Sequence, residues 1–389
     1  MRLALFTPYL PEPPMTGGRI RAHHLATALC AAHEVHLFAT ASRTELAQAA
    51  VKDALQMFAS YHVRPAPFAF MPGFRHPARV RNGVTGSAMR AFARLHAARA
   101  FDAIWVEHVH AARVASSAGL PWLLDEHNIE SAYLRDRLAA RGPLSTRNRR
   151  EVARLEKWEQ SQWRTATQVV CVTTADAERV RKTREKAPII IPNGVDLSKI
   201  RFRPPSERTG ANILFVGLMN HPPNERAALM LVEEIMPRVW ASRPDARLVL
   251  CGANPSRLVR GLKSERVDVT GTVESVGPYL DEARAYAFPL FHGAGSSLKL
   301  LEALAAGVPL VATRVGVRGF DVRPETHYLA AEDGETFATA LLQALAPADV
   351  ARADTRAAAA RALTEAYDWK TLAGRFANAI DQLRLPLAL

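Results

Sequence analysis

Short apolar runs alternate along the chain with longer stretches in which apolar residues recur every three or four positions. The short runs have the length and β-branched content of buried strands, whereas the longer stretches have the period of amphipathic helices. Strands that alternate with helices in this way are typical of βαβ units, in which helices cover a sheet of parallel strands. The pattern therefore predicts an α/β protein.

The two halves of the chain share this pattern. We predict strands at residues 2–7, 34–39, 103–107, 122–125 and 168–172 in the first half, and at residues 213–216, 247–251, 267–270, 287–290 and 309–312 in the second. Helical periodicity is clearest in residues 20–32, 147–165, 224–243, 298–306 and 369–385. Each half is therefore expected to contain a parallel sheet.

A stretch rich in proline and charge, RFRPPSERTG at residues 201–210, has the composition of a linker between the halves. At 389 residues the chain is also too long for one ordinary hydrophobic core. We predict an N-terminal domain over residues 1–195, a C-terminal domain over residues 196–368 and a final helical segment over residues 369–389.

The composition is that of a globular enzyme, with 48% hydrophobic and 23% charged residues. The three cysteines lack CxxC spacing and are expected to be reduced thiols. The first residues, MRLALFTPYLPEPPM, predict a strand and a loop instead of a secretion signal, because their apolar run is very short. No run approaches the roughly 18 apolar residues of a membrane span. We therefore expect a cytoplasmic protein.

Positive charge is concentrated in the first half of the chain. The net charge is +12, and residues 1–200 hold 28 of the 50 Lys and Arg but 17 of the 38 Asp and Glu. Much of the excess lies in residues 74–83 and 137–150. A solvated basic face, an anionic membrane surface and a phosphorylated acceptor would each account for it. Zinc-finger spacing and the aromatic pair of an RNA-recognition motif are absent, so no nucleic-acid partner is predicted.

The most informative chemistry lies in residues 287–319, AFPLFHGAGSSLKLLEALAAGVPLVATRVGVRG. A predicted strand leads through Gly293 and Gly295 into a helix, and such glycines let a diphosphate approach the free N–H groups of the helix start. Lys299 adds a point charge, and Glu302, on the same helix face, can accept hydrogen bonds from ribose hydroxyls. The segment is typical of a nucleotide site, although a solvent-exposed Lys299–Glu302 ion pair would have the same spacing.

Histidines and carboxylates gather after two other strands, in the strings EHVH at residues 107–110 and DEH at residues 125–127. These side chains are of types that bind metals. Because neighbouring residues on a strand point to opposite faces, each string offers only some of its members to one site. No metal ion is predicted, and His127 by itself is compatible with catalysis or with a cap on a loop.

Several strings, in this order, resemble one family of enzymes. KLLEALAAGVPLVAT at residues 299–313 is similar to the donor-site signature of retaining GT-B glycosyltransferases of family 4, also called group 1. PNGVD at residues 192–196 resembles the interdomain motif of that family, and LDEHNIES at residues 124–131 also matches. The resemblance covers nearly the whole chain and is nearest to sugar transferases of exopolysaccharide assembly.

This resemblance implies a GT-B fold, in which two doubly wound Rossmann-like domains face each other across a cleft. The C-terminal domain would bind a nucleotide-sugar donor, the N-terminal domain would present the acceptor, and the last helix would cross back to the N-terminal domain. Enzymes of this class need no metal, so we expect no cofactor besides the nucleotide-sugar, which is the donor substrate.

The resemblance also implies roles for individual residues. Glu302 matches the glutamate that holds the donor ribose, Lys299 would face the diphosphate, and His127 matches the histidine near the reacting sugar. The expected catalytic residues are His127, Lys299 and Glu302. The expected donor-binding residues are Gly17, Gly18, Asn220, His292, Gly293, Gly295, Ser296, Ser297, Lys299 and Glu302.

The chain departs from the family pattern in two regions. Ala294 stands where the first glutamate of the family's E-x7-E pair would fall, and His292 replaces a common arginine. Leu218 and Pro223 lie where many relatives carry a diphosphate-binding arginine and lysine, so Asn220 is the nearest polar side chain. Phosphate binding is therefore expected to depend on the lysine of the helix, on its first N–H groups and on His292.

We expect a hexosyltransferase that moves a sugar from a nucleoside diphosphate sugar to an acceptor hydroxyl, with retention, in polysaccharide or glycoconjugate synthesis. The acceptor would be a sugar or a lipid-linked sugar, and the basic first half would bind the inner face of the cell membrane. A nucleotide-sugar epimerase of the same fold and a non-catalytic sugar-nucleotide-binding protein are the alternatives. A nicotinamide dehydrogenase is disfavoured because no GxGxxG follows the first strand.

Overall fold

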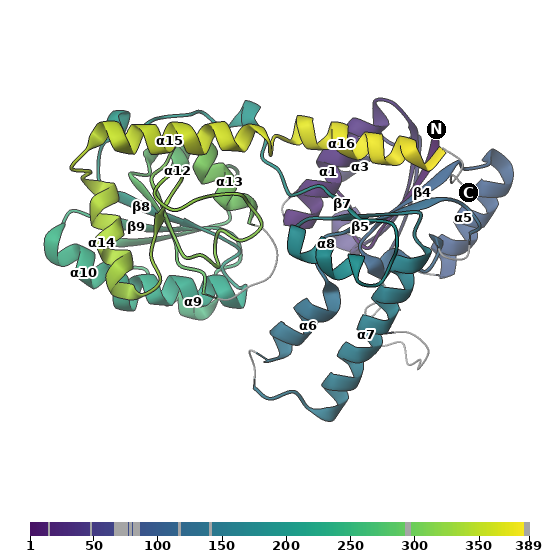
Figure 1. Cartoon of the computed structure of the whole chain (residues 1–389), viewed down its shortest axis with the longest axis horizontal. Helices are drawn as coiled ribbons and strands as arrows, with labels where there is room; N and C mark the ends of the chain where they lie inside the picture. Colours follow the sequence, from purple (N-terminus) through teal and green to yellow (C-terminus); the bar gives the residue numbers. More distant parts are fainter. Residues whose placement is uncertain are drawn as a thin grey trace. The chain divides into compact units, whose positions relative to one another are not determined.

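The chain folds into two compact units in a computed structural model that describes residues 1–14, 16–46, 49–65, 77, 80, 86–115, 118–139, 142–291 and 297–384. The first unit comprises Met1–Pro192 together with Leu372–Leu389, and the second comprises Asn193–Thr371 (Figure 1). Among the described residues, no helix combines the length and the apolar character needed to cross a membrane.

The first unit contains a seven-stranded parallel sheet in the order β3-β2-β1-β4-β5-β6-β7. Its strands are β1 (Arg2–Thr7), β2 (Glu34–Ala41), β3 (Ser60–Pro65), β4 (Ala103–Glu107), β5 (Trp122–Glu126), β6 (Gln168–Cys171) and β7 (Ile189–Ile190). Its helices are α1 (Gly17–Cys30), α2 (Arg43–Leu46), α3 (Ala49–Leu55), α5 (Gly86–Arg99), α6 (Glu130–Ala139), α7 (Thr146–Thr165), α8 (Thr174–Arg181) and, from Leu372 on, α16 (Trp369–Asp381), with 3₁₀ turns at Val109–Ala111 and Gln382–Arg384.

Aromatic side chains fill the core of the first unit. The rings of Phe6 and Phe38, on neighbouring strands, stack with their centroids 4.7 Å apart. From the end of the chain, α16 contributes Phe376, whose ring centroid lies 5.0 Å from that of the buried Trp105. Because α16 buries an aromatic ring here, the last helix is part of this core.

Helices α6 and α7 pack against each other and extend away from the sheet of the first unit (Figure 1). Leu134 of α6 and Val152 and Leu155 of α7 form a small buried cluster between them. The N-cap Ser145 accepts a hydrogen bond from the backbone N–H of Asn148, which starts α7 close to the predicted residue 147.

The second unit contains a six-stranded parallel sheet in the order β10-β9-β8-β11-β12-β13. Its strands are β8 (Asn212–Val216), β9 (Arg247–Cys251), β10 (Val267–Gly271), β11 (Ala285–Phe288), β12 (Leu310–Ala312) and β13 (Leu329–Ala330). Its helices are α9 (Pro222–Met230), α10 (Met236–Ser242), α11 (Arg257–Gly261), α12 (Gly277–Glu282), α13 (Leu298–Ala305), α14 (Gly334–Leu345) and α15 (Val350–Glu365), with a π turn at Leu231–Ile235 and 3₁₀ turns at Leu197–Lys199 and Pro205–Glu207.

Helices cover both sides of this second sheet. In Figure 1, α12, α13 and α15 lie on one side and α9 and α10 on the other. The predicted helix over residues 224–243 is interrupted by the π turn, because Pro237 in the first turn of α10 has no N–H to continue the α-helical pattern.

The prediction of an α/β protein is confirmed, since both sheets are parallel and alternate with helices. Three strands, β3, β7 and β13, were not predicted, because β7 and β13 have two residues each and β3 alternates apolar with polar side chains. Strand β11 begins at Ala285, two residues before the predicted start.

The strand order reverses at the centre of each sheet. In the first unit the reversal lies between β1 and β4, and in the second unit it lies between β8 and β11. In open parallel sheets, loops diverge at this point and leave a crevice outside the carboxyl ends of the two strands, where ligands bind. Each unit therefore has one preferred ligand site, at the carboxyl ends of its central strands.

Candidate active site

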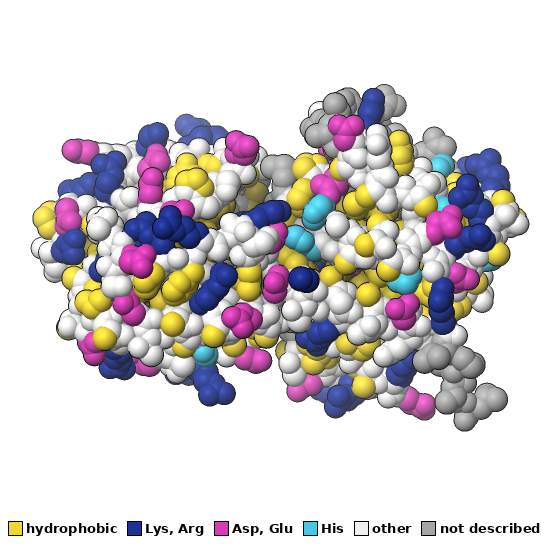
Figure 2. All heavy atoms as spheres, turned by 90° about the horizontal axis from the view of Figure 1, so that it is seen from above, with side chains coloured by type: hydrophobic (Ala, Val, Ile, Leu, Met, Phe, Trp, Pro, Cys, Tyr) yellow, Lys and Arg dark blue, Asp and Glu magenta, His cyan; other side chains and the backbone are white. Residues whose placement is uncertain are grey.

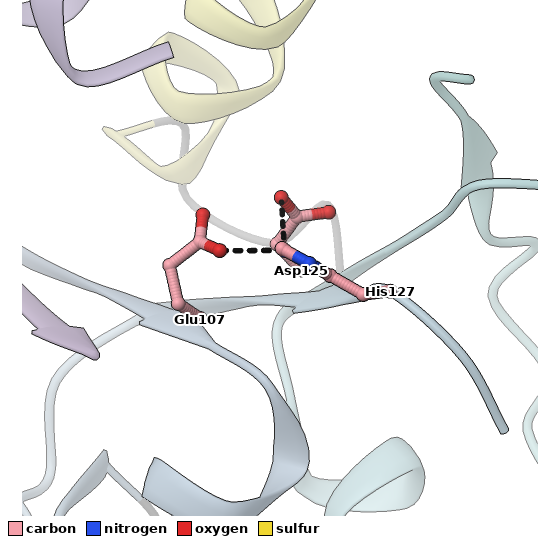
Figure 3. Close-up of side chains that lie close together, drawn as sticks. All are labelled: Glu107, Asp125 and His127. Carbon is pink, nitrogen blue, oxygen red and sulfur yellow. Dashed lines mark ion pairs between the residues drawn. The ribbon is translucent and has the colours of Figure 1, made fainter. Parts of the chain in front are cut away.

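Three side chains meet at the carboxyl end of the first sheet, where β4 and β5 end (Figure 3). Glu107 and Asp125 are paired in the parallel register, so their side chains point to the same face. His127 follows Asp125 by two positions and extends the same face. Glu126 lies between them in sequence and points to the opposite face. As the strand alternation predicted, only some members of each string reach this site.

The imidazole of His127 lies against both carboxylates. Its Nε2 is 2.5 Å from Oε2 of Glu107 and 3.5 Å from Oδ2 of Asp125. All three residues are buried. Burial lowers the pKa of His127, but the two carboxylates outweigh burial and raise that pKa to about 9. His127 is therefore an imidazolium at neutral pH.

Arg21 of α1 holds the second carboxylate in place. Its Nε and its Nη2 each donate a hydrogen bond of 2.8 Å to Asp125, and neither side chain is exposed to solvent. Burial raises the pKa of Asp125, but Arg21 and His127 together outweigh burial, through their charges and hydrogen bonds, and hold that pKa well below its ordinary value. Asp125 is therefore an anion at any pH at which the protein works.

A second pair of histidines lies beside this group. The ring centroid of His108 is 4.0 Å from that of His127, and Glu130 has an oxygen 3.6 Å from Nδ1 of His108 and another 3.4 Å from Nε2 of His110. Burial, and then the charge of His127, lower the pKa of His108 to about 4, so His108 is neutral. Its backbone has φ = 62°, a strained conformation for a residue other than glycine and one found mostly at functional sites.

The start of α1 approaches His127 closely, and Gly18, the second residue of the helix, makes the approach feasible. A Cβ atom at Gly18 would lie 2.7 Å from the hydroxyl oxygen of Tyr9 and 3.4 Å from Nδ1 of His127. Two of the expected residues, Gly18 and His127, are thus brought together in the first unit. Gly17 is the first residue of α1.

In the second unit, Lys299 and Glu302 lie at the other reversal of strand order. They occupy the start of α13, which follows β11 along the chain. Nζ of Lys299 is 3.0 Å and 3.1 Å from the two carboxylate oxygens of Glu302, and the two side chains are 31% and 22% exposed. In this structure the pair therefore forms a half-buried ion pair on one face of the helix.

The structure describes only two of the other donor-binding residues expected in the second unit. Asn220 is exposed in the turn between β8 and α9, and Ser297 is the N-cap residue of α13. The remaining four lie outside the described residues: His292, Gly293, Gly295 and Ser296.

Two glycines that the sequence analysis did not single out bring backbone segments together at the same edge of this sheet. Gly252, just after β9, has φ = +149°, and a Cβ atom there would lie 1.8 Å from the carbonyl oxygen of Gly217. Gly217 follows β8 and donates its N–H to the carbonyl of Cys251. A glycine directly after each of two predicted strands was the available signal.

Arg21, Tyr9 and Glu130 were not predicted to lie at this site, although Glu130 belongs to the string LDEHNIES at residues 124–131. For Arg21 the available signal was a charged side chain within the apolar stripe of a predicted helix, next to Ala22 and four residues before buried Leu25 on the next turn. Such a residue needs a buried partner of opposite charge, but nothing local indicates which one.

The Glu107, Asp125 and His127 group has ligand atoms within 4.8 Å of one another, as a metal site would require. However, Asp125 already accepts two hydrogen bonds from Arg21, and the guanidinium would repel a metal cation. The charges of Arg21 and protonated His127 balance those of the two carboxylates. The four side chains therefore form a neutral set without a further cation.

Solved structures share this architecture. Sucrose-phosphate synthase from Thermosynechococcus elongatus superposes with a TM-score of 0.70 at 20% identity and covers 98% of this chain and 99% of that one. HepE from Anabaena, solved in complex with UDP and glucose, has a TM-score of 0.68 at 16% identity over 98% of this chain and 100% of that one. WaaG, a glycosyltransferase of lipopolysaccharide biosynthesis, has a TM-score of 0.63 at 15% identity and covers 98% and 99%. The two parallel sheets, each covered by helices, are those of the GT-B fold of glycosyltransferases.

Family models match each half separately. Residues 15–199 match the model described as Glycosyltransferase Family 4, and residues 210–347 match the model described as Glycosyl transferases group 1. The protein is a glycosyltransferase of the group 1 and family 4 type.

Curated relatives are named phosphatidyl-myo-inositol mannosyltransferase. The protein from Mycobacterium leprae is 29% identical over 195 residues, which are 48% of this chain and 51% of the relative. The protein from Mycobacterium tuberculosis strain H37Rv is 27% identical over 198 residues, with the same coverage. The chain thus spans about half the length of the curated relatives that it matches.

Proposed function

We propose that the protein transfers a hexosyl group from a nucleoside diphosphate sugar to an acceptor hydroxyl, with retention of configuration. The observation that carries this proposal is the position of Lys299 and Glu302. Both lie in the first turns of α13, which follows the strand at which the order of the second sheet reverses. Binding of UDP and glucose by HepE, a protein of the same fold, supports a nucleotide-sugar as the donor.

In the donor complex, the ion pair between Lys299 and Glu302 is broken, and each side chain binds the donor instead. Nζ of Lys299 turns to the diphosphate, to which a point charge and the free N–H groups of a helix start are well suited. The carboxylate of Glu302 then accepts hydrogen bonds from the two ribose hydroxyls. The exposed Asn220 supplies a further contact to the phosphates. His292, Gly293, Gly295 and Ser296, which lie outside the described residues, complete the proposed set of donor-binding residues.

The chemical step requires stabilisation of the departing nucleotide. As the bond between the anomeric carbon and the phosphate oxygen breaks, that oxygen gains negative charge, and Lys299 with the N–H groups of α13 stabilises it. The acceptor oxygen bonds to the anomeric carbon, and its proton passes to the released phosphate. His127 orients the sugar or the acceptor from the first unit.

A lipid-linked sugar at a membrane surface is the acceptor that we propose, in polysaccharide or glycoconjugate synthesis. The first unit carries exposed basic side chains at the start of α7, at Arg147, Arg149 and Arg150. In the second unit, basic and acidic side chains are interspersed on the face that Figure 2 draws. The mycobacterial relatives support this proposal, since phosphatidyl-myo-inositol in their name is a membrane lipid.

Replacing Glu302 tests the donor site. We expect Glu302→Ala to weaken UDP binding at least tenfold, because the ribose hydroxyls lose a charged acceptor worth about 1.5–3 kcal/mol. Isothermal titration of UDP, followed by a mass-spectrometric screen against a mixture of nucleotide-sugars and acceptors, measures binding and turnover. Glu335→Ala, an exposed glutamate near the start of α14, is the control and should leave both unchanged.

Unchanged UDP affinity in Glu302→Ala would contradict the proposed donor site. UDP binding without turnover of any donor would instead favour a non-catalytic sugar-nucleotide-binding protein. Interconversion of the donor sugar in the absence of an acceptor would favour a nucleotide-sugar epimerase.

A further inference from the structure

Arg21 is a fully buried charged residue to which the reaction above assigns no task. It lies on the core side of α1, among Ala22, Leu25 and other apolar residues, with no exposed surface. Burying a guanidinium costs several kcal/mol unless partners satisfy it. An arginine at such a position is therefore retained for what it binds.

The hydrogen-bond donors of Arg21 bind at two places. Nε and Nη2 bind the two oxygens of Asp125, at 2.8 Å each. Nη1 donates to the carbonyl oxygens of Ile191 and Pro192, at 2.9 Å and 3.0 Å. Pro192 is the residue at which the first unit ends and the chain continues into the second. Arg21 thus hydrogen-bonds both to Asp125 in the site of His127 and to the two residues that follow β7, just before this junction.

The fixed carboxylate of Asp125 limits what His127 can do. Two carboxylates lie near Nε2 of His127, and one guanidinium neutralises only one of them. A proton on each ring nitrogen supplies the missing positive charge. Because Nε2 faces the carboxylates, the free hydrogen-bonding edge is Nδ1, which faces Gly18 at the start of α1. A protonated Nδ1 donates a hydrogen bond and cannot accept a proton.

We propose that Arg21 is a positioning residue of the transfer reaction. It fixes Asp125, and Asp125 and Glu107 together hold His127 as an imidazolium that donates a hydrogen bond from Nδ1. This role rests on the proposed function. It assigns His127 as a hydrogen-bond donor to an oxygen of the sugar, acceptor or phosphate, and it excludes His127 as the base that removes the acceptor proton.

The groups around His127 agree with this charge state. Those that face the ring are Glu107 and His108 from the end of β4, Asp125 from β5, Arg21 from α1 and Tyr9 from the loop after β1. His108 is neutral because burial and the charge of His127 lower its pKa to about 4. Tyr9 is neutral because burial and two carboxylates raise its pKa well above the ordinary value. Burial raises the pKa of Glu107, and the charge of His127, whose Nε2 lies 2.5 Å from Oε2 of Glu107, opposes this rise. In the proposed charge state the cations are Arg21 and His127, and the anions are Asp125 and Glu107.

An NMR titration of the full chain labelled with ¹⁵N-histidine tests the charge state without any need for activity. In the wild type, we expect both ring nitrogens of His127 to stay protonated up to a midpoint of about pH 9. Asp125→Asn and Glu107→Gln, which keep the size of each side chain, should lower this midpoint by at least about one unit each, since each removes a charge. A wild-type midpoint near 6.5, or a neutral His127 beside a protonated Glu107, would overturn the proposal.

Variants of Arg21 test the positioning role. Arg21→Lys should lower kcat about tenfold and shift the alkaline limb of its pH profile downward, while the KM for the donor stays within about twofold. Arg375→Lys is the matched control, because Arg375 of α16 donates to the carbonyl of Ile190 at 2.6 Å, one residue before the carbonyls that Arg21 binds, and it makes no hydrogen bond to Asp125 or His127 among the described residues. If Arg21→Lys does not fold, Asp125→Asn carries the same kinetic test.

The two proposals can fail separately. A wild type that transfers no sugar but whose His127 titrates near pH 9 contradicts the proposed function and leaves the charge assignment standing. A wild type that transfers sugar with kcat and pH profile unchanged in Arg21→Lys and in Asp125→Asn contradicts the positioning role alone.

Discussion

Two neighbouring acidic residues of β5, Asp125 and Glu126, have different protonation states because they point to opposite faces of the sheet. Asp125 points toward Arg21 and stays ionised, whereas Glu126, its neighbour, points to the other face and lies near Glu159 of α7. Burial, and then the charge of Glu159, raise the pKa of Glu126 well above its ordinary value. Two adjacent carboxyl groups therefore carry different charges because alternation sends them into different surroundings.

Glu159 provides a prediction for stability at the scale of a residue. Burial raises its pKa to about 7 from an ordinary 4.5, although the backbone N–H of Ser131 donates a hydrogen bond to it. The folded protein therefore binds this proton more tightly than the unfolded chain. The resulting stabilisation is complete below pH 4.5 and is lost as the pH rises through 7. We expect the free energy of unfolding to vary less with pH in Glu159→Gln, by up to about 3 kcal/mol over this range.

Urea unfolding at a series of pH values between 4.5 and 7.5 measures the effect. Glu178→Gln, at an exposed glutamate of α8, should leave the slope of the wild type unchanged. An identical slope in the wild type and in Glu159→Gln would show that Glu159 ionises normally in the folded protein.

At the scale of elements, strand ends and the loops that follow them create both sites. In the first unit, parallel register places Glu107 beside Asp125, and Gly18 brings the start of α1 against His127. In the second unit, Gly252 and Gly217 bring two loops into backbone contact at the carboxyl ends of β8 and β9. Side chains at these glycines would separate elements that the sites need close together.

Gly252→Ala tests this requirement. The added methyl group would overlap the carbonyl oxygen of Gly217, and its backbone conformation, φ = +149°, is one that alanine rarely adopts. We expect a loss of about 3 kcal/mol or more in the free energy of unfolding, together with weaker UDP binding. Gly261→Ala in α11, where nothing lies within 4 Å of the new atom, should be neutral or slightly stabilising. Equal stability of the two variants by thermal unfolding would contradict the packing described for this loop.

At the scale of the whole molecule, charge is divided unequally between the halves of the chain. Of the 50 Lys and Arg, 28 fall within residues 1–200, against 17 of the 38 Asp and Glu. Helices α6 and α7 extend from the sheet of the first unit and expose part of this excess (Figure 1). Basic side chains near an anionic membrane contribute about 1 kcal/mol each to binding, and salt screens this attraction.

Reversing three of these charges tests membrane binding. We expect Arg147→Glu/Arg149→Glu/Arg150→Glu to reduce binding to phosphatidylglycerol-containing vesicles about a hundredfold, by sedimentation at low salt, and to reduce transfer to a lipid-linked acceptor. The matched control reverses three exposed arginines of the second unit, Arg247, Arg257 and Arg260. Equal vesicle binding by the wild type and both triple variants would contradict a role of α7 at the membrane.

The sequence by itself determined the α/β class, the position of most strands and helices, and the segment around Lys299 and Glu302, because hydrophobic period and short motifs are local properties of the chain. It also marked His127, which ends a predicted strand. Only the tertiary structure decided which groups surround that histidine. Arg21 and Asp125 are 104 residues apart in sequence, and their contact depends on the strand order and on the packing of α1. The hydrophobic periodicity of the sequence does not indicate such a pairing, because the free energy of a buried charge depends on the partner that folding brings to it.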